Sequence, residues 1–196
     1  MSQGKFTPEN TAMLLIDHQV GTMSWVGSAD LVGIKSNTVA LARSAQALNM
    51  PLILTSSMEE APQGPLISEL SAAVPVAFEK RVQRSGVVNS MDDPAFAEAV
   101  TSTDCKNLII AGITTDVCVV APAISAVKDG YNVLVVVDAC GSPTKIADDI
   151  ALQRMEKAGV ELTTTNALIS EIAHDWASPN GQVLMGIMYE EILSKY

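Results

Sequence analysis

The amino-acid sequence predicts a three-layer α/β/α sandwich built around a mostly parallel, doubly wound sheet. Short apolar runs rich in Val, Ile and Leu recur along the chain, and such runs are typical of strands covered on both faces. Segments with helical spacing of apolar residues lie between these runs, so strand alternates with helix. The length of 196 residues fits one domain, residues 1–196.

Each expected element has a sequence signal of its own. The apolar runs predict strands at residues 12–16, 51–55, 107–111, 132–137 and 160–163. Helices are expected at residues 31–48, 95–100, 117–128, 146–158 and 180–193. Asp93 and Pro94 suit the first turn of the second helix, while Gly130 and Gly159 suit the ends of the third and fourth. Residues 56–65 form the most loop-like interior segment.

The composition excludes several classes of protein. Apolar residues make up 48% of the chain, so it is not disordered. The net charge is −10 and the longest basic run is Lys80-Arg81, which indicates no nucleic-acid partner. We find no signal-peptide pattern and no apolar run of about 18 residues, so we expect no membrane partner. Three cysteines without CxxC spacing indicate free thiols in the cytoplasm.

Two polar residues follow predicted strands at the edge where ligands bind in such folds. Asp17 ends the first strand, where partial burial raises a carboxyl pKa toward general-base duty. The alternative is an ordinary turn or helix-cap residue. Cys118 falls in the first turn of a helix after the third strand, where free N–H groups are expected to lower its thiol pKa. The alternative is a small buried apolar residue. Cys105 and Cys140 are interpreted as structural.

Histidines and cations give weaker signals. Two histidines, His18 and His174, are too few for a classical zinc site. A dyad of His18 with Cys118 is conceivable, but adjacent residues leaving a strand point in different directions. His174 is expected to pack at a helix end. The segment 79–86 supplies cations that could hold the aspartate and the thiolate in register, or could be an ordinary surface turn.

Three segments in this order resemble the isochorismatase-like cysteine hydrolases. They are LLIDHQ at 14–19, QR at 83–84 ahead of NS at 89–90, and AGITTDVCV at 111–119. The similarity runs from about residue 11 to 176, and the segment around Cys118 is its most specific part. The first segment, the GPL at 64–66 and the asparagine after Arg84 are most similar to the YcaC-type subgroup.

The resemblance implies a catalytic triad of Asp17, a cation and Cys118. Its spacing selects Arg84 as the cation, with Lys80 as the alternative. Family members usually carry lysine there, and an arginine stays charged, so it would orient groups and stabilise charge without shuttling a proton. The resemblance also implies a cis peptide between Ile113 and Thr114, and an oxyanion hole made by the N–H groups of Thr114 and Cys118.

Further expectations concern the pocket and the metal. Gln19 and Asn89 are candidate polar contacts for the substrate. Relatives that hydrolyse nicotinamide carry an Asp and His metal motif after the second strand, whereas residues 55–60 contain no histidine. We therefore expect no metal and no other cofactor. Isochorismatase proper lacks the nucleophilic cysteine, so Cys118 argues against vinyl-ether chemistry.

These observations predict a hydrolase that cleaves a small amide-like C–N substrate through a thioester. One alternative is a catalytically silent, oligomeric binding or scaffold protein with a vestigial triad. Another is a nucleotide-binding domain, which the absence of GxGxxG and GxxxxGK[ST] disfavours. The resemblance implies a homo-oligomer, and the apolar residues of segment 180–193 could serve a subunit interface or the core.

Overall fold

The computed structural model describes residues 6–195 and has a six-stranded parallel sheet at its centre. The strand order is β3-β2-β1-β4-β5-β6, and every neighbouring pair is parallel. The strands are β1 (Thr11–Ile16), β2 (Leu52–Ser57), β3 (Val82–Arg84), β4 (Asn107–Gly112), β5 (Asn132–Val136) and β6 (Glu161–Thr163).

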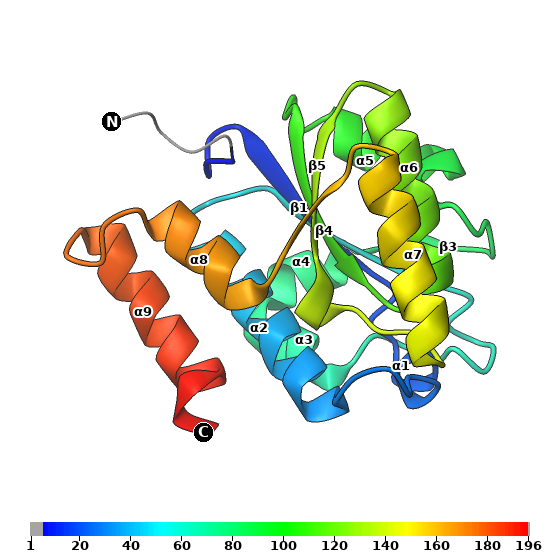
Figure 1. Ribbon diagram of the computed structural model, residues 1–196, viewed down its shortest axis with the longest axis horizontal. Helices are drawn as coiled ribbons and strands as arrows, with labels where there is room; N and C mark the ends of the chain where they lie inside the picture. The colour runs from blue at the N-terminus through cyan, green and yellow to red at the C-terminus, as the bar shows by residue number, and fades with distance from the viewer. Residues whose placement is uncertain (1–5, 196) are drawn as a thin grey trace.

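Helices cover both faces of the sheet (Figure 1). They are α1 (Val20–Ser24), α2 (Leu31–Ala47), α3 (Ser68–Ala73), α4 (Pro75–Glu79), α5 (Pro94–Thr101), α6 (Val120–Lys128), α7 (Lys145–Lys157), α8 (Thr165–Ala173) and α9 (Pro179–Glu191). Helices α5, α6 and α7 lie on one side of the sheet and α2 and α8 on the other, with α9 packed outside α2 and α8. The predicted three-layer fold is confirmed.

The two central strands are apolar and buried along their whole length. β1 and β4 run side by side, and their last residues, Ile16 and Gly112, are paired. The chain continues from β1 to β2 on one side, and β4 lies on the other side of β1. The strand order therefore reverses between β1 and β4, and in open parallel sheets ligands bind in the crevice beyond such a point.

The helices begin where side chains satisfy their first N–H groups. Asp30 accepts from Gly33 N at the start of α2, and Asp93 accepts from Ala95 N and Phe96 N at the start of α5. Ser178 caps α9 in the same way. All five predicted helices form, and each begins and ends close to the predicted residues, although the third opens with a π-helical turn, η2 (Thr115–Val119).

Several elements differ from the expectation. Residues 82–84 form an edge strand, β3, where a basic turn was one interpretation, and β2 extends to Ser57 into the expected loop. Helices α1, α3, α4 and α8 are additional. His174 is not packed but exposed, at the end of α8.

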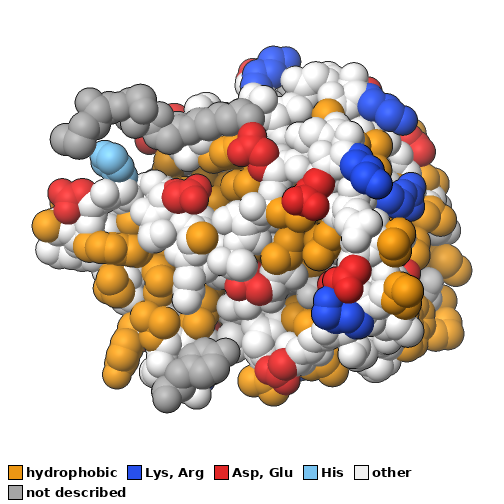
Figure 2. Space-filling model, in the orientation of Figure 1, with side chains coloured by type: hydrophobic (Ala, Val, Ile, Leu, Met, Phe, Trp, Pro, Cys, Tyr) orange, Lys and Arg blue, Asp and Glu red, His pale blue; other side chains and the backbone are white. Residues whose placement is uncertain are grey.

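The apolar residues of the C-terminal helix are mostly core. Leu184, Ile187 and Met188 are buried against α2 and α8, while Val183 and Tyr189 stay exposed. Figure 2 shows hydrophobic side chains along this helix, and on the same face acidic and basic side chains are interspersed. Within residues 6–195, no helix has the length and apolar character needed to cross a membrane.

Candidate active site

Asp17 is the first residue beyond β1 and has a left-handed backbone, with φ of 56°. Aspartate tolerates this conformation better than most residues, and the turn directs the chain away from the sheet. The Asp17 N–H donates to Thr55 O at 2.9 Å, and its carbonyl accepts from the Thr22 hydroxyl at 2.8 Å. The carboxylate is thus held, buried, at the carboxyl end of the central strand.

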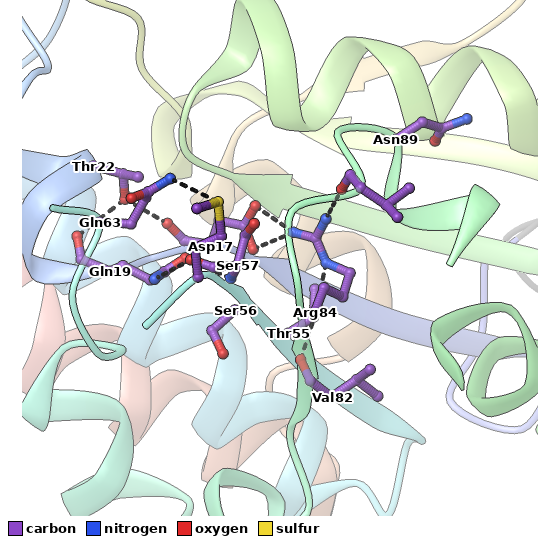
Figure 3. A network of polar contacts seen from close by, with 12 residues as sticks. Asp17, Gln19, Thr22, Thr55, Ser56, Ser57, Gln63, Val82, Arg84 and Asn89 are labelled. Atoms are coloured by element: carbon purple, nitrogen blue, oxygen red, sulfur yellow. Dashed lines mark hydrogen bonds and ion pairs between the residues drawn. The ribbon is translucent and has the colours of Figure 1, made fainter. Parts of the chain in front are cut away.

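Arg84, the last residue of β3, faces this carboxylate (Figure 3). Its Nη2 donates to both carboxylate oxygens of Asp17. Its Nε donates to Thr55 Oγ1 at 3.0 Å and its Nη1 to Val87 O at 2.5 Å. All three nitrogens of the guanidinium therefore donate to groups of the protein, and the side chain is held rigidly.

Burial and charge act on Asp17 in opposite directions. Removal from water raises the pKa of the Asp17 carboxyl, and the positive charge and hydrogen bonds of Arg84 oppose this rise. Burial is the larger effect, so the pKa of the Asp17 carboxyl lies above its ordinary value, in the direction that its place at the end of a buried strand predicted. A carboxylate of this kind accepts a proton more readily than an exposed one.

Cys118 lies in the π-helical turn after β4, is half-buried, and is near enough to Asp17 for each group to shift the pKa of the other. Burial and the nearby Asp17 charge raise the pKa of the thiol to about 12. The expected lowering by the helix N-terminus is therefore wrong for this resting arrangement. A hydrogen bond from the backbone N–H of Thr114 and the positive charge of Arg84 lower the pKa of the thiol, but burial and Asp17 outweigh them.

Most N–H groups of the turn are bonded within the turn and do not face the thiol. The carbonyl of Thr114 accepts from the N–H groups of Val117, Cys118 and Val119, the second at 2.9 Å. The Cys118 N–H is thus already bonded. The Ile113–Thr114 peptide is cis, and the Thr114 N–H lies beside the Cys118 thiol, whose pKa it lowers.

These residues line a cavity of about 390 Å³. Asp17, Arg84, Thr114 and Cys118 contribute to its wall, as does Gln19. The remaining lining residues are Thr22, Trp25, Ser57, Met58, Gln63, Gly86, Val87, Val88, Asp116, Val117 and Pro143. The structure thus gathers, in one cavity, residues at or beyond the ends of four strands, β1 to β4.

The two candidate substrate contacts are placed differently. The Gln19 amide is fully buried and ties two loop segments together: its Oε1 accepts from Ser57 N at 2.8 Å, and its Nε2 donates to Ser57 O and Gly64 O. Asn89 does not line the cavity. Its side chain donates to Ser125 Oγ at 2.9 Å and lies away from Asp17 in Figure 3.

The other candidates lie outside the cavity. Lys80 is exposed at the end of α4, so Arg84 is the cation next to Asp17. His18 is not among the residues that line the cavity, and its Nε2 lies 3.0 Å from Ala139 O; a carbonyl only accepts, so this nitrogen carries the proton. Burial lowers the pKa of His18 to about 4. Cys105 and Cys140 are buried, and all three cysteines are free thiols.

In residues 55–60, which contain no histidine for a metal motif, Glu59 is the centre of a cluster of ion pairs and hydrogen bonds. Glu59 accepts from Arg81 Nε at 2.8 Å, from Ser56 Oγ at 2.6 Å and from Gln83 Nε2 at 2.8 Å. These bonds lower the pKa of Glu59 to about 2. Among residues 6–195, no group of three or more His, Cys, Asp and Glu side chains is arranged to hold a metal ion.

Some residues of the site carried no sequence signal. Thr55 and the carbonyl of Val87 orient Arg84, and Trp25, Met58 and Val117 give the cavity apolar walls. The position of Thr55 at the carboxyl end of a predicted strand was its one visible signal. Val117 was adjacent to the candidate nucleophile, whereas Trp25, Met58 and Val87 had no neighbour in the sequence that indicated a pocket.

Comparison with known proteins places the chain among relatives with this fold. The Isochorismatase domain family matches residues 11–167. The chain is 41% identical, over 85% of its length and 79% of the relative's, to the probable hydrolase YcaC of Escherichia coli. It is 30% identical to isochorismatase domain-containing protein 2 of Rattus norvegicus, over 97% of the chain and 87% of the relative.

Two solved structures are similar over nearly the whole chain. YcaC from Pseudomonas aeruginosa, described with hexane-2,5-diol and covalent acrylamide, has a TM-score of 0.91 at 36% identity, covering 99% of this chain and 95% of that one. YcaC from Escherichia coli, described as an octameric hydrolase of unknown specificity, has a TM-score of 0.91 at 38% identity, covering 96% and 91%.

Proposed function

Because the chain belongs to the isochorismatase family, whose YcaC members are described as hydrolases, we propose that it is a cysteine hydrolase of small amide-like C–N substrates. Cys118 is the nucleophile, Asp17 the general base and acid, and Arg84 the cation that orients Asp17. The reaction uses no metal and no other cofactor. The observation that carries the proposal is the placement of the Cys118 thiol in one cavity with the buried, arginine-bound Asp17 carboxylate, near enough for each to shift the pKa of the other.

The first half of the reaction forms a thioester. Asp17 accepts the Sγ proton as the sulfur attacks the carbonyl carbon of the amide. This coupling of proton transfer to attack suits a thiol with a pKa of about 12, because little free thiolate exists at neutral pH. The negative charge on the carbonyl oxygen is stabilised by the Thr114 N–H, with the Cys118 N–H as a shared donor. Such donors are often worth ~3–4 kcal/mol.

The second half releases both products. The proton held by Asp17 passes to the leaving nitrogen as the C–N bond breaks, which frees an amine or ammonia. Asp17 then takes a proton from a water molecule, and the hydroxide attacks the thioester carbonyl. The C–S bond breaks, the sulfur regains a proton, and a carboxylic acid leaves. The net change is the hydrolysis of one C–N bond.

Arg84 acts through Asp17 and does not exchange protons. Its guanidinium stays charged at any useful pH, and its three bonded nitrogens fix the carboxylate toward the thiol. When Asp17 becomes protonated during the reaction, Arg84 loses its counter-charge. The cation therefore favours return of the proton from Asp17 to the leaving group.

The relatives support two parts of this proposal. The covalent acrylamide described for the Pseudomonas aeruginosa protein is an electrophilic amide bound to a YcaC relative. The octamer described for the Escherichia coli protein supports a homo-oligomer here as well, and the exposed Val183 and Tyr189 of α9 are available for such contacts. We further propose that residues 1–196 act as one domain.

Ammonia or amine release from a panel of small amides tests the function. We expect turnover by the wild-type chain and none by Cys118→Ala. Cys140→Ala is the matched control, because that thiol is buried outside the cavity, and it should keep activity. Activity that survives in Cys118→Ala would overturn the proposal, as would absence of turnover across the panel together with an unreactive Cys118.

A further inference from the structure

The walls of the cavity differ in character from its floor. Five apolar side chains line it and are each more than a third exposed: Trp25, Met58, Val87, Val88 and Val117. Exposed apolar groups that gather around one cavity mark a binding surface. These walls surround the polar floor formed by Asp17, Arg84 and Cys118, so whatever reaches the nucleophile passes between them.

Hydrogen bonds to the site hold part of this apolar wall in place. The Met58 N–H donates to Arg84 O at 2.9 Å, and the Val87 carbonyl accepts from Arg84 Nη1. The Met58 sulfur accepts from the Gln63 amide at 3.8 Å. The wall is therefore continuous with the catalytic framework, which favours a preformed surface.

The charges of the cavity do not suit an anion. Arg84 is the one Lys or Arg residue in the described lining, and all three of its nitrogens already donate to protein groups. Its charge is offset by Asp17. The remaining charged group is Asp116, whose Oδ1 is buried and has no hydrogen-bond partner among the described residues. This oxygen is available to accept an N–H from a ligand and repels a carboxylate.

We infer that the substrate is an uncharged carboxamide with an apolar substituent, which packs between Trp25, Met58, Val88 and Val117 while the amide lies at Cys118. This inference rests on the proposed function, because it names the substrate class of that same site. The described lining of the cavity has no free cation that could bind a carboxylate. We therefore do not expect this chain to act on substrates that carry one.

Binding of four amides to Cys118→Ala, measured by calorimetry at pH 7, tests the inference without turnover. The probes are hexanamide, acetamide, adipamic acid and 5-aminopentanamide; the last two match hexanamide in length but end in a carboxylate and an ammonium. Each buried methylene tightens binding about fourfold. We therefore expect hexanamide to bind at least tenfold more tightly than acetamide and than adipamic acid, with 5-aminopentanamide between hexanamide and adipamic acid.

A charge introduced into the wall provides the matched variant. In Cys118→Ala, the added substitution Val88→Lys should tighten adipamic acid binding at least tenfold and weaken 5-aminopentanamide binding. Val76→Lys is its control, because Val76 is also an exposed valine but lies on α4 outside the cavity. It should change neither affinity.

The outcomes separate this inference from the proposed function. Hexanamide binding no tighter than acetamide, adipamic acid binding as tightly as hexanamide, or no binding by any probe would overturn the inference. If hexanamide binds as expected and the wild-type chain does not hydrolyse it, the binding preference stands and the hydrolase proposal is weakened. If amides are hydrolysed without this preference, the hydrolase proposal stands and the inference fails.

Discussion

The Nη2 group of Arg84 donates to both carboxylate oxygens of Asp17, and each of these side chains is 1% exposed. The pair joins the edge strand β3 to the central strand β1 across β2, where Thr55 accepts from the Arg84 Nε. The site and the edge of the sheet are therefore held by the same contact. A change in either partner affects stability as well as chemistry.

Removal of one partner leaves a buried charge without its counter-charge. We expect Asp17→Asn and Arg84→Gln each to lower the free energy of unfolding by about 3–5 kcal/mol. The double variant should lose less than the sum of the two, because no uncompensated charge remains. Urea unfolding of all four proteins gives this coupling energy. Additive losses would show that the two side chains stabilise the fold independently.

The reactivity of Cys118 should respond to Asp17 in a specific direction. The Asp17 charge helps to raise the thiol pKa to about 12, so Asp17→Asn should lower that pKa while it abolishes hydrolysis. Iodoacetamide alkylation as a function of pH, mapped by peptide, measures the shift. Cys140, whose pKa is raised by its own burial, serves as the internal control. An unchanged Cys118 profile in Asp17→Asn would contradict the assigned contact.

His18 should make stability depend on pH. Its pKa is about 4 in the folded chain and 6.5 when unperturbed, so between these values the unfolded chain binds the extra proton. The free energy of unfolding should therefore fall as pH drops from about 6.5 to about 4, by at most ~1.4 kcal/mol per pH unit. His18→Gln should remove this component, and His174→Gln should retain it. Equal slopes in all three proteins would refute the prediction.

Gly112, the last residue of β4, has no room for a side chain beside β1. A Cβ there would lie 2.5 Å from Ile16 O and 3.0 Å from a methyl of Val119, so Gly112→Ala must displace backbone next to Asp17 and Cys118. We expect Gly112→Ala to lower the free energy of unfolding by about 1–3 kcal/mol. We also expect it to lower the rate of amide hydrolysis by more than this loss of folded protein would explain. Gly186→Ala in α9 meets no atom within 4 Å and should be neutral or stabilising. Thermal unfolding and amide hydrolysis of both variants measure these effects.

The central strands and two site residues could be predicted because their signals are local. Continuous apolar runs predicted β1 and β4. Asp17 directly follows β1 and Cys118 lies in the first turn after β4, so both were expected at the ligand edge. The strand β3 could not be predicted, since three residues are too few to show periodicity. Arg84 therefore came from the family resemblance and not from a predicted strand.

Features that depend on groups far apart in the chain could not be predicted from the sequence. The rise in the pKa of Cys118 results from burial and from Asp17, a hundred residues earlier in the chain, while local position alone favoured the opposite direction. The bonding of Gln19 to Ser57 and Gly64 likewise depends on how two loops meet. Asn89 was adjacent to the site in sequence, but its side chain bonds to Ser125 on α6 instead.

Transfer of an acyl group to Cys118 is the most direct test of the account. The wild-type chain is mixed with p-nitrophenyl hexanoate, the release of p-nitrophenolate is followed, and quenched protein is mapped by peptide mass. We expect a burst of one equivalent with the hexanoyl group on Cys118, a greatly reduced burst in Asp17→Asn, and none in Cys118→Ala. A burst that persists in Cys118→Ala, or acylation mapped to another residue, would contradict the assignment of Cys118 as the nucleophile.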